Sequence, residues 1–164
     1  MTAGQRQAAP LTVEDRLAVS DLYARQSHLI DGGDADGWAA TFTADGVFES
    51  PTYRLTATGR PELAKFAADS NGAARARGVQ LRHWIGQLVI DPTDGGANVQ
   101  AYLIIVATSR QGSRIDRSLR VVDTLSCAGG VWRVASRTVF RDDADLGDAA
   151  VPASEIIPDQ HPSR

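Results

Sequence analysis

Asp31 is the residue whose type and position point most directly to chemistry. The helix predicted over residues 12–30 ends at Gly32-Gly33, and Asp34 is placed to cap the helix that follows. Asp31 stands between these signals and has no capping task of its own. A carboxylate of this kind can bond one ring nitrogen of a histidine, which fixes the tautomer and raises the basicity of the other nitrogen. General acid–base catalysis near neutral pH is the chemistry that such a pair performs.

The residues that share a helical face with Asp31 are mostly small or polar. Ser27, Ala24 and Ser20 precede it at spacings of three and four, whereas Gln26 falls on the opposite side of the same predicted helix. A face of this composition is more typical of a cavity lining than of a packed seam. We therefore expect Asp31 to lie at the edge of a cavity.

Few other residues in the sequence have a reactive setting. Among the histidines, His28 lies on the flank of the first helix and His161 near the C-terminus, so that only His83 lies within a predicted strand. Cys127 comes at a strand end without an obvious base partner, which argues against a nucleophilic role. The sequence has no His-x-x-x-His spacing, no paired cysteines and no glycine-rich phosphate loop, so we expect neither a metal nor another cofactor.

Length and composition describe one domain with an ordinary core. The 164 residues are 43% hydrophobic and carry a net charge of −3, which gives no electrostatic reason to expect nucleic acid as a partner. No apolar run approaches the roughly 20 residues that a membrane-spanning helix needs, so no membrane partner is expected. The polar N-terminus lacks the apolar region of a secretory signal, and one cysteine excludes an internal disulfide, so the sequence predicts a cytoplasmic protein.

Helical patterns come first in the chain and strand patterns follow. A second helix carries Trp38 and Phe42 one turn apart, and Pro51 interrupts a hairpin-like segment over residues 47–55. A third helix begins at Gly59, with Pro61 at a favourable early position, and runs to about residue 76. Long strands separated by turn sequences are then predicted over residues 81–90, 99–108, 114–127 and 131–141. This order indicates an α+β fold.

The pattern resembles the SnoaL-like members of the NTF2-like superfamily. The matching features are Asp31-x-x-Asp34 with Trp38 and Phe42, then Asp45-Gly-Val-Phe48, Arg82-His83 and Gly129-Gly-Val-Trp-Arg-Val-Ala-Ser-Arg137. The resemblance implies a cystatin-like α+β barrel, a cone in which three N-terminal helices pack against a strongly curved mixed or antiparallel sheet. We expect this domain over residues 11–142, with a flexible arm over 1–10 and a tail over 143–164.

The resemblance also implies that Asp31 and His83 both face the interior of the cone. In scytalone dehydratases, an aspartate and a histidine at the positions that match Asp31 and His83 serve the elimination. The resemblance therefore implies that His83 acts as general acid or base in this protein. A second catalytic histidine of those enzymes falls near Tyr102 here, which predicts a catalytic role for that hydroxyl; an ordinary core tyrosine is the alternative. The alternative for the pair is a helix-end carboxylate and a satisfied core histidine.

Further residues are candidates for binding a substrate. Tyr53 resembles a dehydratase tyrosine that holds a substrate oxygen through water, and Tyr23 and Trp84 are either recognition or packing residues. Asp123 faces Arg137 on the next strand as a structural ion pair, or serves as the strand acid that some polyketide cyclases use. Ser50 stands where a ketosteroid isomerase carries its aspartate base, which argues against that activity. An Arg-x-Asp typical of limonene epoxide hydrolase is missing from residues 99–106.

The sequence therefore predicts a cofactor-independent acid–base enzyme that dehydrates or cyclises a small, hydrophobic, oxygenated molecule of the polyketide type. The alternative is a non-catalytic ligand-binding or scaffold subunit, like the beta subunit of ring-hydroxylating dioxygenases. Both faces of the strands over 81–90 and 99–106 are largely apolar, which predicts a homo-oligomer, a dimer or a trimer. A contact between Asp31 and His83 inside an open pocket would favour the enzyme.

Overall fold

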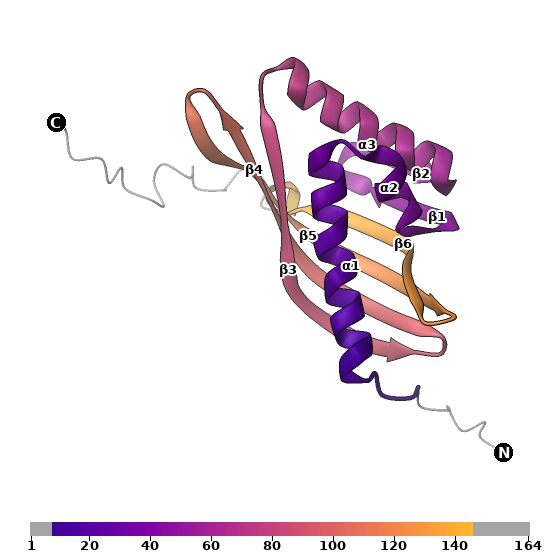
Figure 1. Cartoon of the computed structure of the whole chain (residues 1–164). Coiled ribbons are helices and arrows are strands. Elements are labelled where there is room, and N and C mark those ends of the chain that lie inside the picture. Colours follow the sequence, from indigo (N-terminus) through magenta and orange to yellow (C-terminus); the bar gives the residue numbers. More distant parts are fainter. Residues whose placement is uncertain (1–7, 146–164) are drawn as a thin grey trace, which may run out of the picture.

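A curved sheet with helices on its inner face makes up the structure, a computed structural model that describes residues 8–145 (Figure 1). The α+β class and the cystatin-like architecture are as the sequence predicts. The predicted arm over 1–10 lies largely outside the described residues, as do most of the tail over 143–164 and His161. No helix in the described part of the chain is long and apolar enough to cross a membrane.

Local signals in the sequence set the ends of the first two helices. Helix α1 (Val13–Gly32) begins with a capping box, in which Thr12 accepts a hydrogen bond from the backbone of Asp15 and the Asp15 side chain accepts from the backbone of Thr12. It ends at Gly33, whose φ of 83° is the left-handed conformation that favours glycine. Asp34 caps α2 (Ala35–Ala40) by accepting from the Gly37 amide.

Helix α2 is shorter than the sequence pattern indicates. Phe42 does not lie on it, but is the first residue of strand β1 (Phe42–Ser50). The rings of Trp38 and Phe42 are nevertheless 4.8 Å apart between centroids, so the predicted contact forms across the turn. Pro51 ends β1 and opens a short 3₁₀ helix, η1 (Pro51–Tyr53), after which the chain returns as β2 (Leu55–Thr58).

The remaining elements are α3 (Gly59–Ala76) and four long strands that agree closely with the predicted ones. These are β3 (Gln80–Thr93), β4 (Gly96–Ser109), β5 (Gly112–Ala128) and β6 (Val131–Arg141), followed by the 3₁₀ helix η2 (Asp142–Asp145). The six strands form one sheet in the order β2-β1-β6-β5-β4-β3. Only the β1–β6 pair is parallel, so the sheet is mixed.

Bulges bend the sheet around α1. The β3–β4 register shifts between Gly86 and Val89, where Gln87 takes the unusual φ of 55°, and β4 and β5 shift against each other at Ile105–Val106. Each bulge inserts an extra residue and increases the local twist. Figure 1 shows the result, with α1 lying across the inner face of the sheet and α3 beside β1 and β2. An interior therefore lies between the helices and the sheet.

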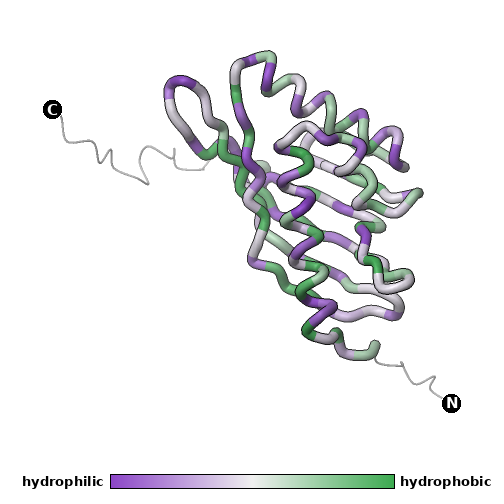
Figure 2. The backbone as a smooth tube through the Cα atoms, in the orientation of Figure 1, coloured by the Kyte–Doolittle hydropathy of each residue, from purple (hydrophilic) through white to green (hydrophobic). Residues whose placement is uncertain are grey.

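Apolar side chains from both layers fill much of this interior. Along β5, buried and exposed residues alternate over residues 119–125, as expected when one face of a sheet is buried. The tube in Figure 2 carries hydrophobic residues on the helices and the strands alike. An aromatic cluster occupies the end nearest α2 and α3: Trp38 lies 6.1 Å from Phe48 and 5.9 Å from Phe66 between ring centroids, and Phe48 stacks on Phe66 at 4.5 Å. This cluster forms one wall of an apolar cavity.

Candidate active site

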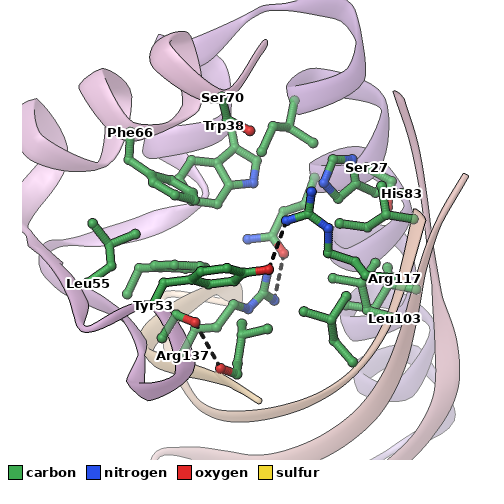
Figure 3. A pocket seen from close by; sticks show the side chains of 18 residues that line it. Ser27, Trp38, Tyr53, Leu55, Phe66, Ser70, His83, Leu103, Arg117 and Arg137 are labelled. Carbon is green, nitrogen blue, oxygen red and sulfur yellow. Dashed lines mark hydrogen bonds between the residues drawn. The ribbon is translucent and has the colours of Figure 1, made fainter. Parts of the chain in front are cut away.

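An apolar cavity of about 270 Å³ remains open between the helices and the sheet (Figure 3). This volume lies at the lower end of the range for small-molecule pockets. Its polar lining consists of hydroxyls, one amide and three basic side chains, and its walls are otherwise aliphatic or aromatic. The lining residues are Gln26, Ser27, Ile30, Trp38, Phe48, Ser50, Tyr53, Leu55, Phe66, Ser70, His83, Ile85, Leu103, Ile105, Arg117, Leu119, Arg137 and Val139.

Asp31 and His83 meet at the edge of this cavity. Nδ1 of His83 lies 2.6 Å from Oδ1 of Asp31, and the backbone amide of His83 donates to Oδ2 at 3.0 Å. Asp31 is 8% exposed and does not line the cavity, whereas the His83 ring does. One carboxylate thus holds both the main chain and the ring of the same residue. These two contacts fix the orientation of the imidazole ring.

The contact also determines which ring nitrogen is available for chemistry. A neutral imidazole bonded to a carboxylate through Nδ1 carries its proton there, so Nε2 is left as an acceptor. Nε2 makes no hydrogen bond to any side chain or backbone atom of residues 8–145. An imidazole whose tautomer is set in this way by a buried carboxylate can act as a general base.

The face of α1 that lines the cavity differs from the predicted one. Ser27 lines it, but Ser20 and Ala24 are exposed, whereas Gln26, assigned to the opposite side, is buried and lines the cavity. The buried side of α1 is the stripe that packs on the sheet, and it consists of Val19, Leu22, Tyr23, Gln26 and Ile30, together with Asp31 at the end of the helix. Asp31 reaches His83 because it lies at the last turn of the helix, next to β3.

Tyr102 and Trp84 lie on the outer face of the sheet. Tyr102 is 63% exposed and Trp84 is 70% exposed, and neither lines the cavity. The prediction that Tyr102 faces the cavity is wrong, because side chains alternate along a strand and its neighbours Leu103 and Ile105 point inward instead. Trp84 borders a second hollow between α1 and β3, which Asp31 and His28 also line. This hollow shares Ser27, His83 and Ile85 with the cavity.

Ser50 and Tyr53 do line the cavity, and both are already hydrogen-bonded. The Ser50 hydroxyl donates to the Val139 carbonyl at 3.2 Å. The Tyr53 hydroxyl, on the half-exposed η1 segment, accepts from Arg117 and Arg141 at 3.2 Å each. Arg117 in turn donates to Asp116 through Nε, and its Nη2 lies 2.6 Å from the same carboxylate oxygen. Tyr53 and Arg117 therefore form a linked pair on the wall of the cavity, as Figure 3 shows.

A buried polar network lies behind another part of the cavity wall. Asp123, 1% exposed, accepts from Nε and Nη2 of Arg137, with the shortest contact at 2.6 Å, and from the Tyr23 hydroxyl at 2.5 Å. Nη2 of Arg137 also donates to Gln26 at 2.9 Å. Asp123 and Tyr23 do not line the cavity, and Arg137 and Gln26 do. The predicted Asp123–Arg137 ion pair is present.

Burial and charge keep this network in one protonation state. Burial raises the pKa of the Tyr23 hydroxyl well above its usual range, and the neighbouring Asp123 charge raises it further. Burial alone would lower the pKa of the Arg137 guanidinium, but the charge and hydrogen bonds of Asp123 outweigh it and raise that pKa. Tyr23 thus stays neutral and Arg137 stays charged at any ordinary pH. With its oxygens occupied by these partners, Asp123 is poorly placed to deliver a proton.

Sequence reasoning missed Gln26 and Arg117 as cavity residues and saw Arg137 only as a structural partner. No signal in the sequence identifies Arg117, which lies in a strand of alternating polar residues. The strand pairing predicts that Arg137 faces Asp123, but it does not predict that Arg137 also lines the cavity. No group of three or more histidine, cysteine, aspartate or glutamate side chains with metal-binding geometry occurs in residues 8–145.

Comparison with known proteins identifies the family. The sequence profile of the SnoaL-like domain matches residues 11–138. The chain belongs to the SnoaL-like family. No curated protein gives a significant match to this SnoaL-like chain.

Solved structures with the same fold include Aln2 from a Streptomyces species, which is 34% identical to this SnoaL-like protein, with 84% of this chain and 98% of that one covered and a TM-score of 0.74. A protein of Catenulispora acidiphila in complex with S-DNPA is 32% identical, with 80% and 96% covered and a TM-score of 0.70. A beta subunit assigned to an aromatic-ring-hydroxylating dioxygenase from Novosphingobium aromaticivorans is 25% identical, with 77% and 88% covered and a TM-score of 0.61.

Proposed function

We propose that this SnoaL-like protein is a cofactor-independent acid–base enzyme that dehydrates or cyclises a small, hydrophobic, oxygenated substrate of the polyketide type. The observation that carries the proposal is the Asp31–His83 contact of 2.6 Å at the edge of an open apolar cavity. A base with a fixed tautomer and a free nitrogen facing an apolar space has the properties that proton abstraction requires. The similarity to a Catenulispora acidiphila protein that binds S-DNPA supports a small-molecule ligand for this cavity.

The proposed reaction moves one proton through His83. Nε2 takes a proton from the carbon next to a substrate carbonyl, and the electron pair of the broken C–H bond moves into the carbonyl to give an enolate. When the enolate re-forms the carbonyl, a hydroxyl on the β-carbon leaves with the proton from the imidazolium, which yields a double bond and water. In a cyclisation, the enolate carbon instead attacks a second carbonyl, whose oxygen takes that proton. Asp31 stabilises the imidazolium in either case.

The first step is testable without the natural substrate. We expect the protein to catalyse deuterium exchange from D₂O at the carbon next to the carbonyl of 2-tetralone, a two-ring ketone, because His83 would abstract that proton. NMR of the ketone measures the rate, and protein heated to unfolding serves as the blank. A protein that binds 2-tetralone but does not accelerate exchange would contradict the proposed chemistry and favour a ligand-binding subunit.

Assembly is a second proposal, and it concerns the outer face of the sheet. Trp84, Val89, Tyr102, Ile104 and Val122 are exposed there, and strand pairing places Trp84 beside Ile104 and Val122 beside Gln100. Several large, exposed apolar side chains on one face of a sheet are typical of a protein–protein contact. We propose that two copies pack through this outer-sheet patch as a symmetric dimer.

Charged residues in the outer-sheet patch are expected to separate the copies. The double variant Trp84→Glu/Tyr102→Glu should sediment as a monomer at a concentration where the natural protein sediments as a dimer, because burying the new carboxylates is costly. Leu17→Glu, an equally exposed apolar position on α1, is the matched control and should leave the sedimentation unchanged. A natural protein that is monomeric, or a double variant that still dimerises, would rule out this patch.

A further inference from the structure

The basic side chains around the cavity line its interior, and the acids that pair with them do not. Three basic side chains line it, His83 from β3, Arg117 from β5 and Arg137 from β6, and no aspartate or glutamate of residues 8–145 does. Each base has its acid behind it, outside the lining: Asp31 behind His83, Asp116 behind Arg117 and Asp123 behind Arg137. The two arginine pairs are neutral overall, and each presents its positive end to the cavity; His83 becomes positive only when it takes up a second proton.

Arg137 differs from Arg117 in having a nitrogen to spare. In Arg117, Nε and Nη2 bond Asp116 and Nη1 bonds Tyr53, so every nitrogen has a partner. In Arg137, Nε and Nη2 bond Asp123 and Gln26, and Nη1 has no hydrogen-bond partner within residues 8–145. Nη1 is also not among the fully enclosed polar atoms that lack a partner, so it borders open space. The residue is 6% exposed, and the cavity is the space it lines.

The surroundings of Arg137 hold its guanidinium in place before any ligand arrives. Asp123 and Gln26 fix two nitrogens, and the group lies over the rings of Tyr23 and Phe42 at 5.3 and 5.8 Å from their centroids. A fixed donor in an apolar, partly enclosed site stabilises negative charge far more strongly than the same donor in water. Charge-assisted hydrogen bonds to an anionic oxygen are about twice as strong as neutral ones.

We propose that Nη1 of Arg137 is an oxyanion-binding site, and that the cavity takes ring compounds carrying an ionised oxygen, a phenolate or an enolate. The predicted tyrosines do not compete for this task, because Tyr102 lies outside, Tyr23 donates to Asp123, and Tyr53 is held by two arginines. In the proposed reaction the site would hold the enolate oxygen while His83 holds the proton, and that use rests on the proposed function. Binding of a phenolate does not.

The test uses 4-nitrophenol, whose absorbance reports ionisation, with 4-nitroanisole as the neutral isostere. An apolar cavity alone would raise the pKa of the bound phenol, whereas a fixed guanidinium would lower it. We expect the natural protein to bind the phenolate about 10-fold or more tighter than the phenol, which lowers the pKa of the bound probe by at least about one unit. Affinity for 4-nitroanisole should not change with pH.

Variants separate Arg137 from the other basic groups of the cavity. The preference for the phenolate should persist in His83→Ala and in Arg117→Gln, and it should weaken by about 10-fold in Arg137→Lys, which keeps a charge for Asp123 but loses the guanidinium fork. If Arg137→Lys does not fold, the two other variants and the natural protein still decide. Three outcomes would overturn the proposal. The protein does not bind 4-nitrophenol, the bound probe ionises no more readily than the free one, or the preference for the phenolate disappears in His83→Ala or in Arg117→Gln. Lost tetralone exchange with retained phenolate preference would instead overturn only the proposed function.

Discussion

His83→Ala is expected to lower the rate of tetralone deuterium exchange by about 10²–10⁴-fold, the usual contribution of a positioned general base. The variant removes the ring that carries Nε2 and keeps the backbone amide that donates to Asp31 at 3.0 Å. Asp31 therefore retains one of its two hydrogen bonds, and the end of α1 stays attached to β3. The loss should appear in the exchange rate with little change in the thermal midpoint.

His28→Ala is the matched control for this experiment. His28 is exposed and borders the same second hollow as Asp31 and His83, but unlike His83 it does not line the cavity. We expect its removal to leave the exchange rate unchanged. Equal losses of exchange rate in the two variants would mean that the reaction does not depend on His83 in particular. An unchanged rate in His83→Ala would mean that the Asp31–His83 pair takes no part in the reaction.

The fold was largely predictable because its signals are local. Thr12, the Gly32-Gly33 pair and Asp34 mark helix ends through their own hydrogen bonds and backbone angles, and the structure places those ends within two residues of the predicted positions. The end of α2 was not predictable, since a Trp38–Phe42 contact suits a helix as well as a turn into a strand. Two aromatic residues one turn apart do not reveal which backbone connects them.

The site was only partly predictable because its geometry depends on the sheet. The Asp31–His83 contact followed from family resemblance, which carries three-dimensional information that spacing alone does not. Tyr102 was assigned to the wrong face since residues 102–106 are apolar in both alternating sets, so the pattern does not indicate which set points inward. Arg117 reaches Tyr53 across 64 residues of chain, a contact that sheet curvature creates.

Asp123→Ala is expected to lower the free energy of unfolding by about 3–5 kcal/mol, the usual cost of removing one partner from a buried ion pair. The loss is large because Arg137 keeps its charge while Nε loses its acceptor and Nη2 keeps only Gln26, and because Tyr23 loses the acceptor of its hydroxyl. Urea denaturation followed by fluorescence measures it. Asp21→Ala is the control, since it also breaks an Asp–Arg pair, but the Asp21 and Arg25 side chains are mostly exposed and solvent weakens their attraction.

The double variant Asp123→Leu/Arg137→Met tests whether the stability lost in Asp123→Ala is the cost of leaving the Arg137 guanidinium unpaired. If the cost of Asp123→Ala comes from the unpaired guanidinium, removing the guanidinium as well should recover part of the lost stability, because apolar residues of similar volume often replace a buried ion pair without loss. It should not recover phenolate binding, which needs Nη1 of Arg137. A double variant as unstable as Asp123→Ala would mean instead that Tyr23 and Gln26 depend on the network for their own packing. The ion pair would then stabilise the fold directly, as well as hold the proposed oxyanion donor.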